Sequence, residues 1–122
     1  MLIAAFAGLA AAVALGTALA IIHLRGTTAP VIPWPLRTLH GLLGIGGLAC
    51  LILSLRGPPR GLDQGVASFG AISAGLIGLA ALAGLGVLFV HVVKKRRAGS
   101  LIALHATLAV TGFVILLAYL SA

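Results

Sequence analysis

The sequence predicts an all-α membrane protein: a four-transmembrane-helix up-down bundle built from two parallel helix-hairpin repeats. Three observations support this prediction. The chain has 122 residues, of which 61% are hydrophobic and 7% charged, whereas roughly a quarter of the residues of a soluble domain are charged. The charged residues fall in short clusters between long apolar runs, as in polytopic membrane proteins. The two halves of the chain also carry histidine and glycine at matching places.

Four apolar runs are each long enough to cross a bilayer, which takes about 20 residues. We expect helices at about 2–24, 36–55, 66–93 and 101–120, within a single transmembrane domain that covers 1–122. The first run carries no charge and is longer than the apolar region of a signal peptide, which spans about 7–15 residues. We therefore interpret it as a retained helix.

The connections between the runs are short, so neighbouring helices should be antiparallel. Pro30, Pro33 and Pro35 forbid a continuous helix through the first connection. The segment Gly57-Pro58-Pro59-Arg60-Gly61 predicts a turn in the second. Two aromatic residues near the ends of the runs are expected to anchor the membrane interfaces: Trp34 and Tyr119.

The basic residues indicate how the bundle is oriented. Loops 25–37 and 94–100 carry six of them, and the opposite side carries two, Arg56 and Arg60. Because cytoplasmic loops are enriched in Lys and Arg, we expect both loops in the cytoplasm and both termini on the other side. The net charge of +7 predicts contact with the lipid bilayer and no nucleic-acid partner, because the basic residues flank apolar runs, where they set topology and attract anionic lipid.

The repeat is clearest around two histidines. Segments 39–47 and 104–112, aligned on His40 and His105, share Leu, His, Leu and Gly at equivalent places. The apolar runs before these segments also end alike, each with a His seven residues after a Gly: Gly16 and His23, then Gly84 and His91. The repeat halves are therefore about 1–56 and 66–122, and they should be related by a pseudo-twofold axis along the membrane normal.

Each predicted helix carries one histidine: His23, His40, His91 and His105. Two of them end helices that run toward the cytoplasmic loops, and two begin helices that leave those loops. We therefore expect all four at about one depth, within about two turns of the cytoplasmic interface. A single histidine near an interface usually serves packing or hydrogen bonding, but polar residues in membrane helices cost free energy and tend to be functional. The repeated pattern predicts that at least one histidine pair ligates a cofactor.

Imidazole suits the iron of haem, and also copper, zinc and nickel. No CxxCH motif is present, which excludes covalent c-type haem, and no carboxylate or thiolate stands near the histidines to balance a bare divalent ion. We therefore expect haem b with its propionates toward the basic loops. Arg37, on the face of His40, should bind a propionate or a lipid phosphate. The haem ring should lie against small residues below the histidines: Gly44, Gly47, Ala109 and Gly112.

Two segments carry a family resemblance. Leu39-His40-Gly41-Leu42-Leu43-Gly44 and Leu104-His105-Ala106-Thr107-Leu108-Ala109 resemble the haem-bearing helices of small membrane b-type cytochromes, including the cytochrome b561 type. The resemblance implies histidine-ligated haem b and electron transfer in the membrane. Those families usually place haems near both membrane faces, whereas all four histidines here are expected near one face. Electron transfer across the whole bilayer is therefore not expected.

The pairing of the histidines has two solutions. His40 and His105 could flank one haem b on the pseudo-twofold axis, or two haems could each lie within a hairpin, on His23 with His40 and on His91 with His105. We favour the single haem on His40 and His105, because glycines one to two turns deeper on the same helix faces, Gly44, Gly47 and Gly112, leave space for it. His23 and His91 would then be free to contact a quinone or a propionate.

The leading hypothesis is a haem b-binding membrane cytochrome, or a haem-bearing subunit, that passes electrons between quinol and a partner at one membrane face. The chain has no domain that could meet a soluble donor, so we expect a larger membrane redox complex or a homodimer rather than a stand-alone enzyme. One alternative is a non-catalytic accessory subunit of a larger membrane complex, and another is a membrane metal-handling protein with a four-histidine site. No predicted span contains an acidic residue, which argues against a proton-coupled antiporter of similar size.

Overall fold

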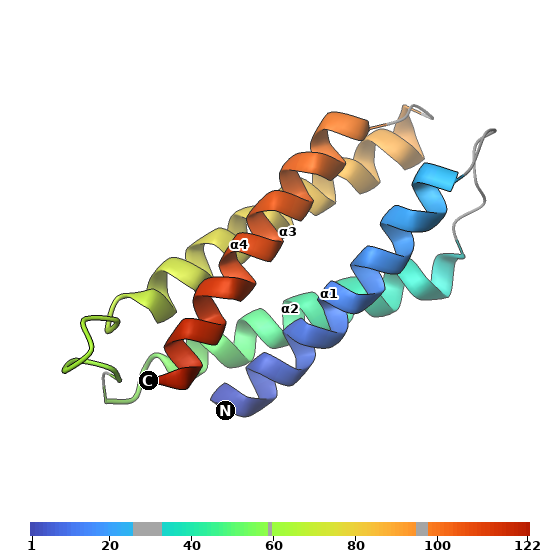
Figure 1. The fold of residues 1–122 in the computed structure, drawn as a ribbon. Coiled ribbons are helices and arrows are strands. Elements are labelled where there is room, and N and C mark those ends of the chain that lie inside the picture. The colour runs from blue at the N-terminus through green and yellow to red at the C-terminus, as the bar shows by residue number, and fades with distance from the viewer. Residues whose placement is uncertain (26–32, 59, 95–97) are drawn as a thin grey trace.

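The computed structural model describes residues 1–25, 33–58, 60–94 and 98–122. They form four α-helices (Figure 1), which are α1 (Leu2–Arg25), α2 (Trp34–Ser54), α3 (Phe69–Val93) and α4 (Gly99–Ser121). Each helix is long enough and apolar enough to cross a membrane. The predicted all-α bundle with four membrane spans is confirmed. The expectations for Pro30, Pro59 and the basic residues 95–97 lie outside the described residues.

The helix bounds differ from the predicted ones mainly at three starts, including that of α4, which begins at Gly99 rather than at residue 101. Helix α2 begins at Trp34, within the segment expected to be a loop, and includes Pro35 in its first turn. Proline is tolerated there because its missing N–H would have had no partner within the helix. Helix α3 begins at Phe69, later than predicted, because two turns follow each other up to that residue. Gly61 and Gly65 hold positive φ angles of 67° and 71°, and the backbone N–H groups of Val66 and Phe69 bond to the carbonyls of Gly61 and Val66.

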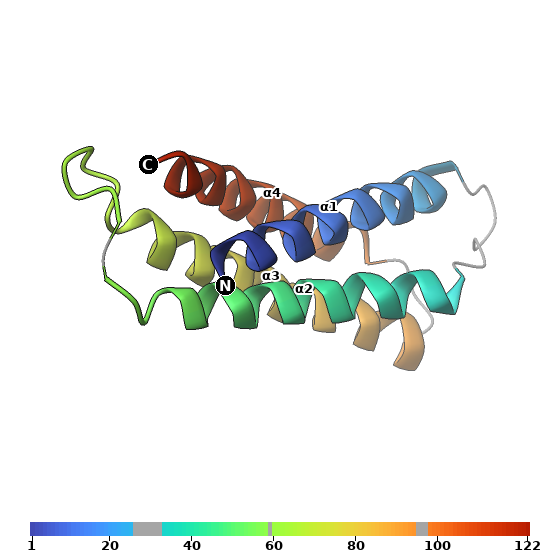
Figure 2. The same cartoon turned by 90° about the horizontal axis from the view of Figure 1, so that it is seen from below.

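The helices form two hairpins. Helix α1 packs along α2, and α3 packs along α4, while the hairpins meet through α1 with α4 and through α2 with α3. Figures 1 and 2 show this arrangement from two sides, with both termini at the same end of the bundle. Helices α2 and α4 are therefore diagonal to each other across the bundle, and the chain runs up, down, up and down as predicted.

The two hairpins are packed in the same way. In the first, a Cβ added to Gly47 would lie 2.8 Å from Leu9 Cγ; in the second, a Cβ added to Gly112 would lie 2.8 Å from Ile77 Cγ1. These glycines are equivalent in the repeat, and so are the side chains that fill the space beside them. Gly47 and Gly112, which we expected to make room for a haem ring, thus let two helices of one hairpin approach closely.

Burial divides the bundle into a closed half and an open half. On α1 the buried residues end at Ala12, and on α3 they end at Ala80. On α2 and α4 they begin at Gly47 and Gly112. All of these positions lie toward the end that carries both termini, which we call the closed half. The described helical residues of the other half, nearer the basic loops, include no buried side chain.

The closed half contains the core and the main contact between the hairpins. The core residues are Ala5, Leu9, Leu51, Ile77, Leu116 and Tyr119. Phe6 of α1 stacks on Phe113 of α4, with ring centroids 5.6 Å apart and planes inclined by 13°. Tyr119 is only 4% exposed and packs over Gly70, so its expected role as an interfacial anchor is corrected: its ring belongs to the core.

The glycine contact inside the hairpin is testable. Gly47→Ala should destabilise the bundle by roughly 1–3 kcal/mol, because the added methyl group would lie 2.8 Å from Leu9 Cγ and 3.0 Å from the Leu9 backbone nitrogen. Gly46→Ala is the matched control, since a Cβ there meets nothing within 4 Å and alanine favours the helix. Unfolding in mixed micelles, followed by circular dichroism, measures both variants. Equal stabilities would contradict the packing described above.

Candidate functional site

Two histidines from different hairpins meet between the helices. His40 of α2 and His105 of α4 have ring centroids 5.8 Å apart, with planes inclined by 76°. Their helices are diagonal in the bundle, so the pair lies near its centre. The sequence left two pairings open, and the structure brings together His40 and His105, the pair that was expected on the pseudo-twofold axis.

Each ring of the pair is held by its own hairpin through Nδ1. His40 Nδ1 lies 2.8 Å from the carbonyl oxygen of Ala12 on α1, and His105 Nδ1 lies 2.6 Å from that of Ala80 on α3. A carbonyl oxygen can only accept a hydrogen bond, so each Nδ1 carries the proton and donates it. In the neutral ring, Nε2 is then the nitrogen with the free lone pair.

A glycine uncovers each of these carbonyls. A Cβ added to Gly16 would lie 3.0 Å from His40 Cε1, and one added to Gly84 would lie 3.1 Å from His105 Cε1. Each glycine is four residues after the alanine whose carbonyl accepts the bond, so it sits one turn further along the same face of the helix. A side chain at either position would press on the imidazole.

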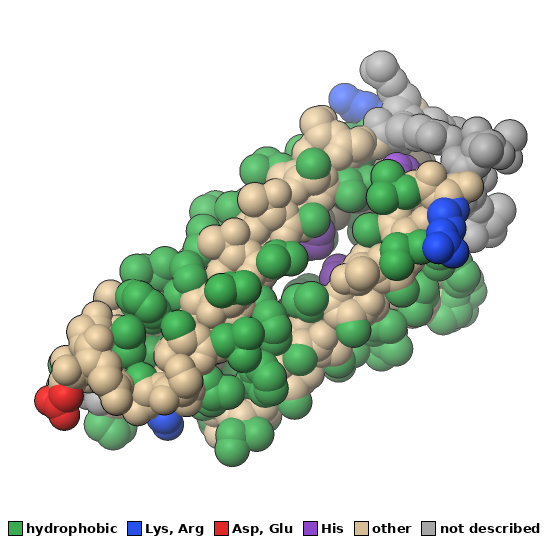
Figure 3. Space-filling model, in the orientation of Figure 1, with side chains coloured by type: hydrophobic (Ala, Val, Ile, Leu, Met, Phe, Trp, Pro, Cys, Tyr) green, Lys and Arg blue, Asp and Glu red, His purple; other side chains and the backbone are tan. Residues whose placement is uncertain are grey.

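The pair lies where the closed half of the bundle ends. Ala12 and Ala80, which accept its hydrogen bonds, are the last buried residues of α1 and α3. Figure 3 shows the molecule hollowed between the two hairpins, with histidine side chains at the edge of the hollow. Both rings are half-buried. Gly41 and Gly44, on the helix of His40, have nothing within 4 Å of an added Cβ, so space remains beside this part of α2.

The other two histidines do not join the pair. Because Gly16 lies beside His40, His23 is about 10 Å further along α1 at 1.5 Å per residue, and His91 is displaced likewise beyond Gly84 on α3. His23 is half-buried and His91 is exposed. The expectation that all four histidines share one depth is therefore wrong: antiparallel packing places them at two levels.

The remaining expected site residues are spread around the pair. Arg37 is half-buried and lies three residues before His40, on the side of the basic loops. Ala109 of α4 is also half-buried. Across the part of the chain that the structure describes, no group of three or more His, Cys, Asp or Glu side chains is placed to hold a metal ion. The metal-ligating potential therefore rests on two imidazoles.

No family model, curated protein or solved structure matches the chain. The ligand-binding chemistry of the site is therefore inferred from its two imidazoles. Two neutral imidazoles with free Nε2 lone pairs are groups that can ligate a metal centre. Ligating histidines almost always donate their other ring N–H to a carboxylate, carbonyl or water, and both rings here donate to a carbonyl.

Ala12 and Ala80, whose carbonyls accept the two imidazole hydrogen bonds, are positions of the candidate site that the sequence pattern does not single out. The spacing Ala12 to Gly16, repeated as Ala80 to Gly84, contains the signal, but on its own it looks like ordinary small-residue packing. We related both glycines to His23 and His91 on their own helices. They in fact serve His40 and His105 on the neighbouring helices.

The proton positions are testable by ¹⁵N NMR of protein labelled at histidine. His40 and His105 should show a protonated Nδ1 and an unprotonated Nε2 at a pH where the rings are neutral. Gly16→Leu should shift the signals of His40 and leave those of His105 in place, because the new side chain pushes only one ring from its carbonyl. Gly41→Leu is the control of equal size, since a Cβ there meets nothing within 4 Å. An Nε2-protonated ring in the unmodified protein would refute the assignment.

Proposed function

We propose that the protein is a membrane cytochrome, or a haem-bearing subunit, in which His40 and His105 ligate one haem b. The observation that carries the proposal is the pair itself: two imidazoles, one from each hairpin, each with Nδ1 bound to a carbonyl. The two ring centroids are only 5.8 Å apart, which supports ligation of one centre by both rings.

The hydrogen bonds prepare the two rings for this role. Each bond fixes the tautomer that leaves Nε2 unprotonated, and it also limits rotation of the imidazole, so little ordering remains to be done when a metal is bound. Haem iron would supply reversible one-electron chemistry between its two oxidation states. Arg37 and the basic loops are the groups of this chain that would hold the propionates.

The position of the pair supports electron exchange at one membrane face. His40 lies six residues after the start of α2, and His105 lies six residues after the start of α4, which places both about 9 Å from the loop ends of their helices. An electron would then arrive from quinol and leave to a partner on the same side. We propose that a larger membrane redox complex, or a second copy of this chain, provides that partner.

The orientation completes the proposal: loops 25–37 and 94–100 face the cytoplasm, and both termini face the opposite side. The six basic residues of those loops, against two at the other end, support it. Lys94→Cys and Ser121→Cys, each in a Cys50→Ala background, test it because both positions are exposed. A membrane-impermeant maleimide applied to cells from outside should label position 121 and spare position 94. The reverse pattern would overturn the orientation.

The haem assignment is tested by the visible spectrum of the purified protein. The reduced protein should show a Soret band and sharp α-bands, and pyridine haemochrome analysis should find one haem b per chain. His40→Ala and His105→Ala should each abolish the bands, because each removes one of the two imidazoles that would hold the haem. Gly16→Leu should weaken haem binding roughly 10- to 100-fold, since it disturbs the group that orients His40.

The matched controls are His23→Ala and His91→Ala, which remove imidazoles about 10 Å from the pair and should keep the spectrum. Loss of colour in these variants but not in His40→Ala would show that the haem is bound by other histidines than the pair. Two haems per chain would favour pairing within each hairpin. A colourless protein from cells with ample haem would end the proposal, and stoichiometric copper or zinc in that protein would favour the metal-handling alternative.

A second candidate is a non-catalytic accessory subunit of a larger membrane complex. The specific observation that favours it is the open space around five glycines of α2 and α3: Gly41, Gly44, Gly46, Gly75 and Gly78. Glycine on a membrane-facing surface lets a partner helix approach closely. Co-purification with a large complex, unchanged when all four histidines are replaced, would select this function over the first.

A further inference from the structure

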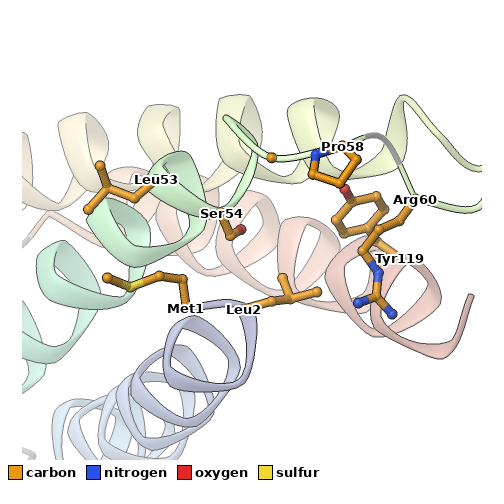
Figure 4. A pocket seen from close by; sticks show the side chains of 8 residues that line it. Met1, Leu2, Leu53, Ser54, Pro58, Arg60 and Tyr119 are labelled. Carbon is orange, nitrogen blue, oxygen red and sulfur yellow. The ribbon is translucent and has the colours of Figure 1, made fainter.

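A second hollow lies at the opposite end of the bundle from the histidine pair. It has a volume of about 420 Å³ and is lined by the start of α1, the end of α2, the following turn and Tyr119 of α4. Figure 4 shows the side chains that line it, with Arg60 and Tyr119 at one end and Leu53 at the other. Both polar and apolar side chains thus line this hollow.

Tyr119, which lines the hollow next to Arg60, is held by the core of the bundle. Tyr119 is 4% exposed, and its ring is seated on Gly70, where an added Cβ would lie 2.9 Å from ring carbons. Its ring is therefore held in place by the core of the closed half. Arg60, by contrast, is exposed on the turn and can direct its guanidinium toward a bound group. Leu2 and Leu53 contribute apolar side chains to the lining.

The charge balance indicates what the hollow receives. Asp63 is the only acidic side chain in the chain, against eight basic ones. Two basic side chains at this end, Arg56 and Arg60, thus stand against one acidic side chain. The planar guanidinium matches the oxygens of a phosphate group particularly well. The hollow lies at the helix ends, which is the depth of the lipid headgroups for helices that span a bilayer.

We propose that this hollow binds the headgroup of an anionic phospholipid. Arg60 donates hydrogen bonds to the phosphate oxygens, Tyr119 forms the firm wall beside them, and the start of an acyl chain lies along Leu2 and Leu53. The site is independent of the haem proposal, because it lies at the other end of the bundle and shares no residue with the histidine pair. Phosphate in a lipid headgroup and free phosphate share this chemistry, but only the lipid also uses the apolar wall.

Native mass spectrometry of the whole protein in detergent tests the site. With added phosphatidylglycerol the protein should retain one lipid more strongly than with phosphatidylcholine. Arg60→Ala should weaken retention of phosphatidylglycerol about fivefold, the effect of one basic group near the membrane surface. Arg60→Lys should weaken it less, because it keeps the charge and loses the planar fork. Arg56→Ala is the matched control: it removes the same charge at the same end, and Arg56 does not line the hollow.

The result expected is a loss in Arg60→Ala that Arg56→Ala does not show. Equal losses in the two variants would overturn the proposal, because they would reflect net charge rather than a site. Displacement of the lipid by millimolar inorganic phosphate would also overturn it, since the hollow would then recognise a free anion without its acyl chain. Leu53→Ser probes the apolar wall and should weaken lipid retention while leaving any binding of inorganic phosphate unchanged.

Discussion

The hydrogen bond from an imidazole to a helix carbonyl is the constraint on which the centre of this bundle depends. A helix carbonyl already accepts the N–H four residues on, so a second donor can reach it only where nearby side chains leave it uncovered. Gly16 and Gly84 provide that access. An imidazole in an apolar bundle without a partner would carry the full cost of its lost hydration, so the glycine, the carbonyl and the histidine form a unit. The chain contains this unit twice, once in each hairpin.

The hairpin is therefore the structural module. Within each hairpin the two helices are in contact at two levels. At the first level a glycine packs against an apolar side chain, Gly47 against Leu9 or Gly112 against Ile77. At the second level, about two turns nearer the loop, the imidazole of His40 or His105 bonds to a carbonyl of the other helix. The second hairpin adds a buried hydrogen bond from the Ser73 hydroxyl to the Gly112 carbonyl, 2.8 Å long. Between the hairpins the close packing is confined to the closed half. The bundle is consequently firm within each hairpin and open between them at the level of the histidines.

Much of this architecture could be predicted from the sequence, for physical reasons that also explain what could not. The four spans follow from the length of the apolar runs, and their antiparallel order follows from short connections. The repeat was visible because His40 and His105 have similar neighbours. The hydrogen-bond acceptors Ala12 and Ala80 could not be predicted, because the spacing of residues along one helix shows only which residues share a face of that helix. Which residue of the next helix lies opposite depends on the register of the hairpin. The same limit explains why Gly47 was assigned to a ligand rather than to Leu9, and why four histidines were expected at one depth.

The separation of the two imidazoles is set by the packing between the hairpins. Each ring is anchored to its own hairpin, so neither can approach the other without moving the helices that hold it. The contacts that join the hairpins, including the Phe6–Phe113 stack at 5.6 Å, lie in the closed half, away from the open end. A change in the angle between the hairpins would therefore change the distance between the two rings. A metal centre held by both rings would in turn fix that angle, since bonds of about 2 Å tolerate little change. If both rings bound one metal centre, ligation and hairpin packing would constrain the same geometry, and the Phe6–Phe113 stack is one of the contacts that would hold it.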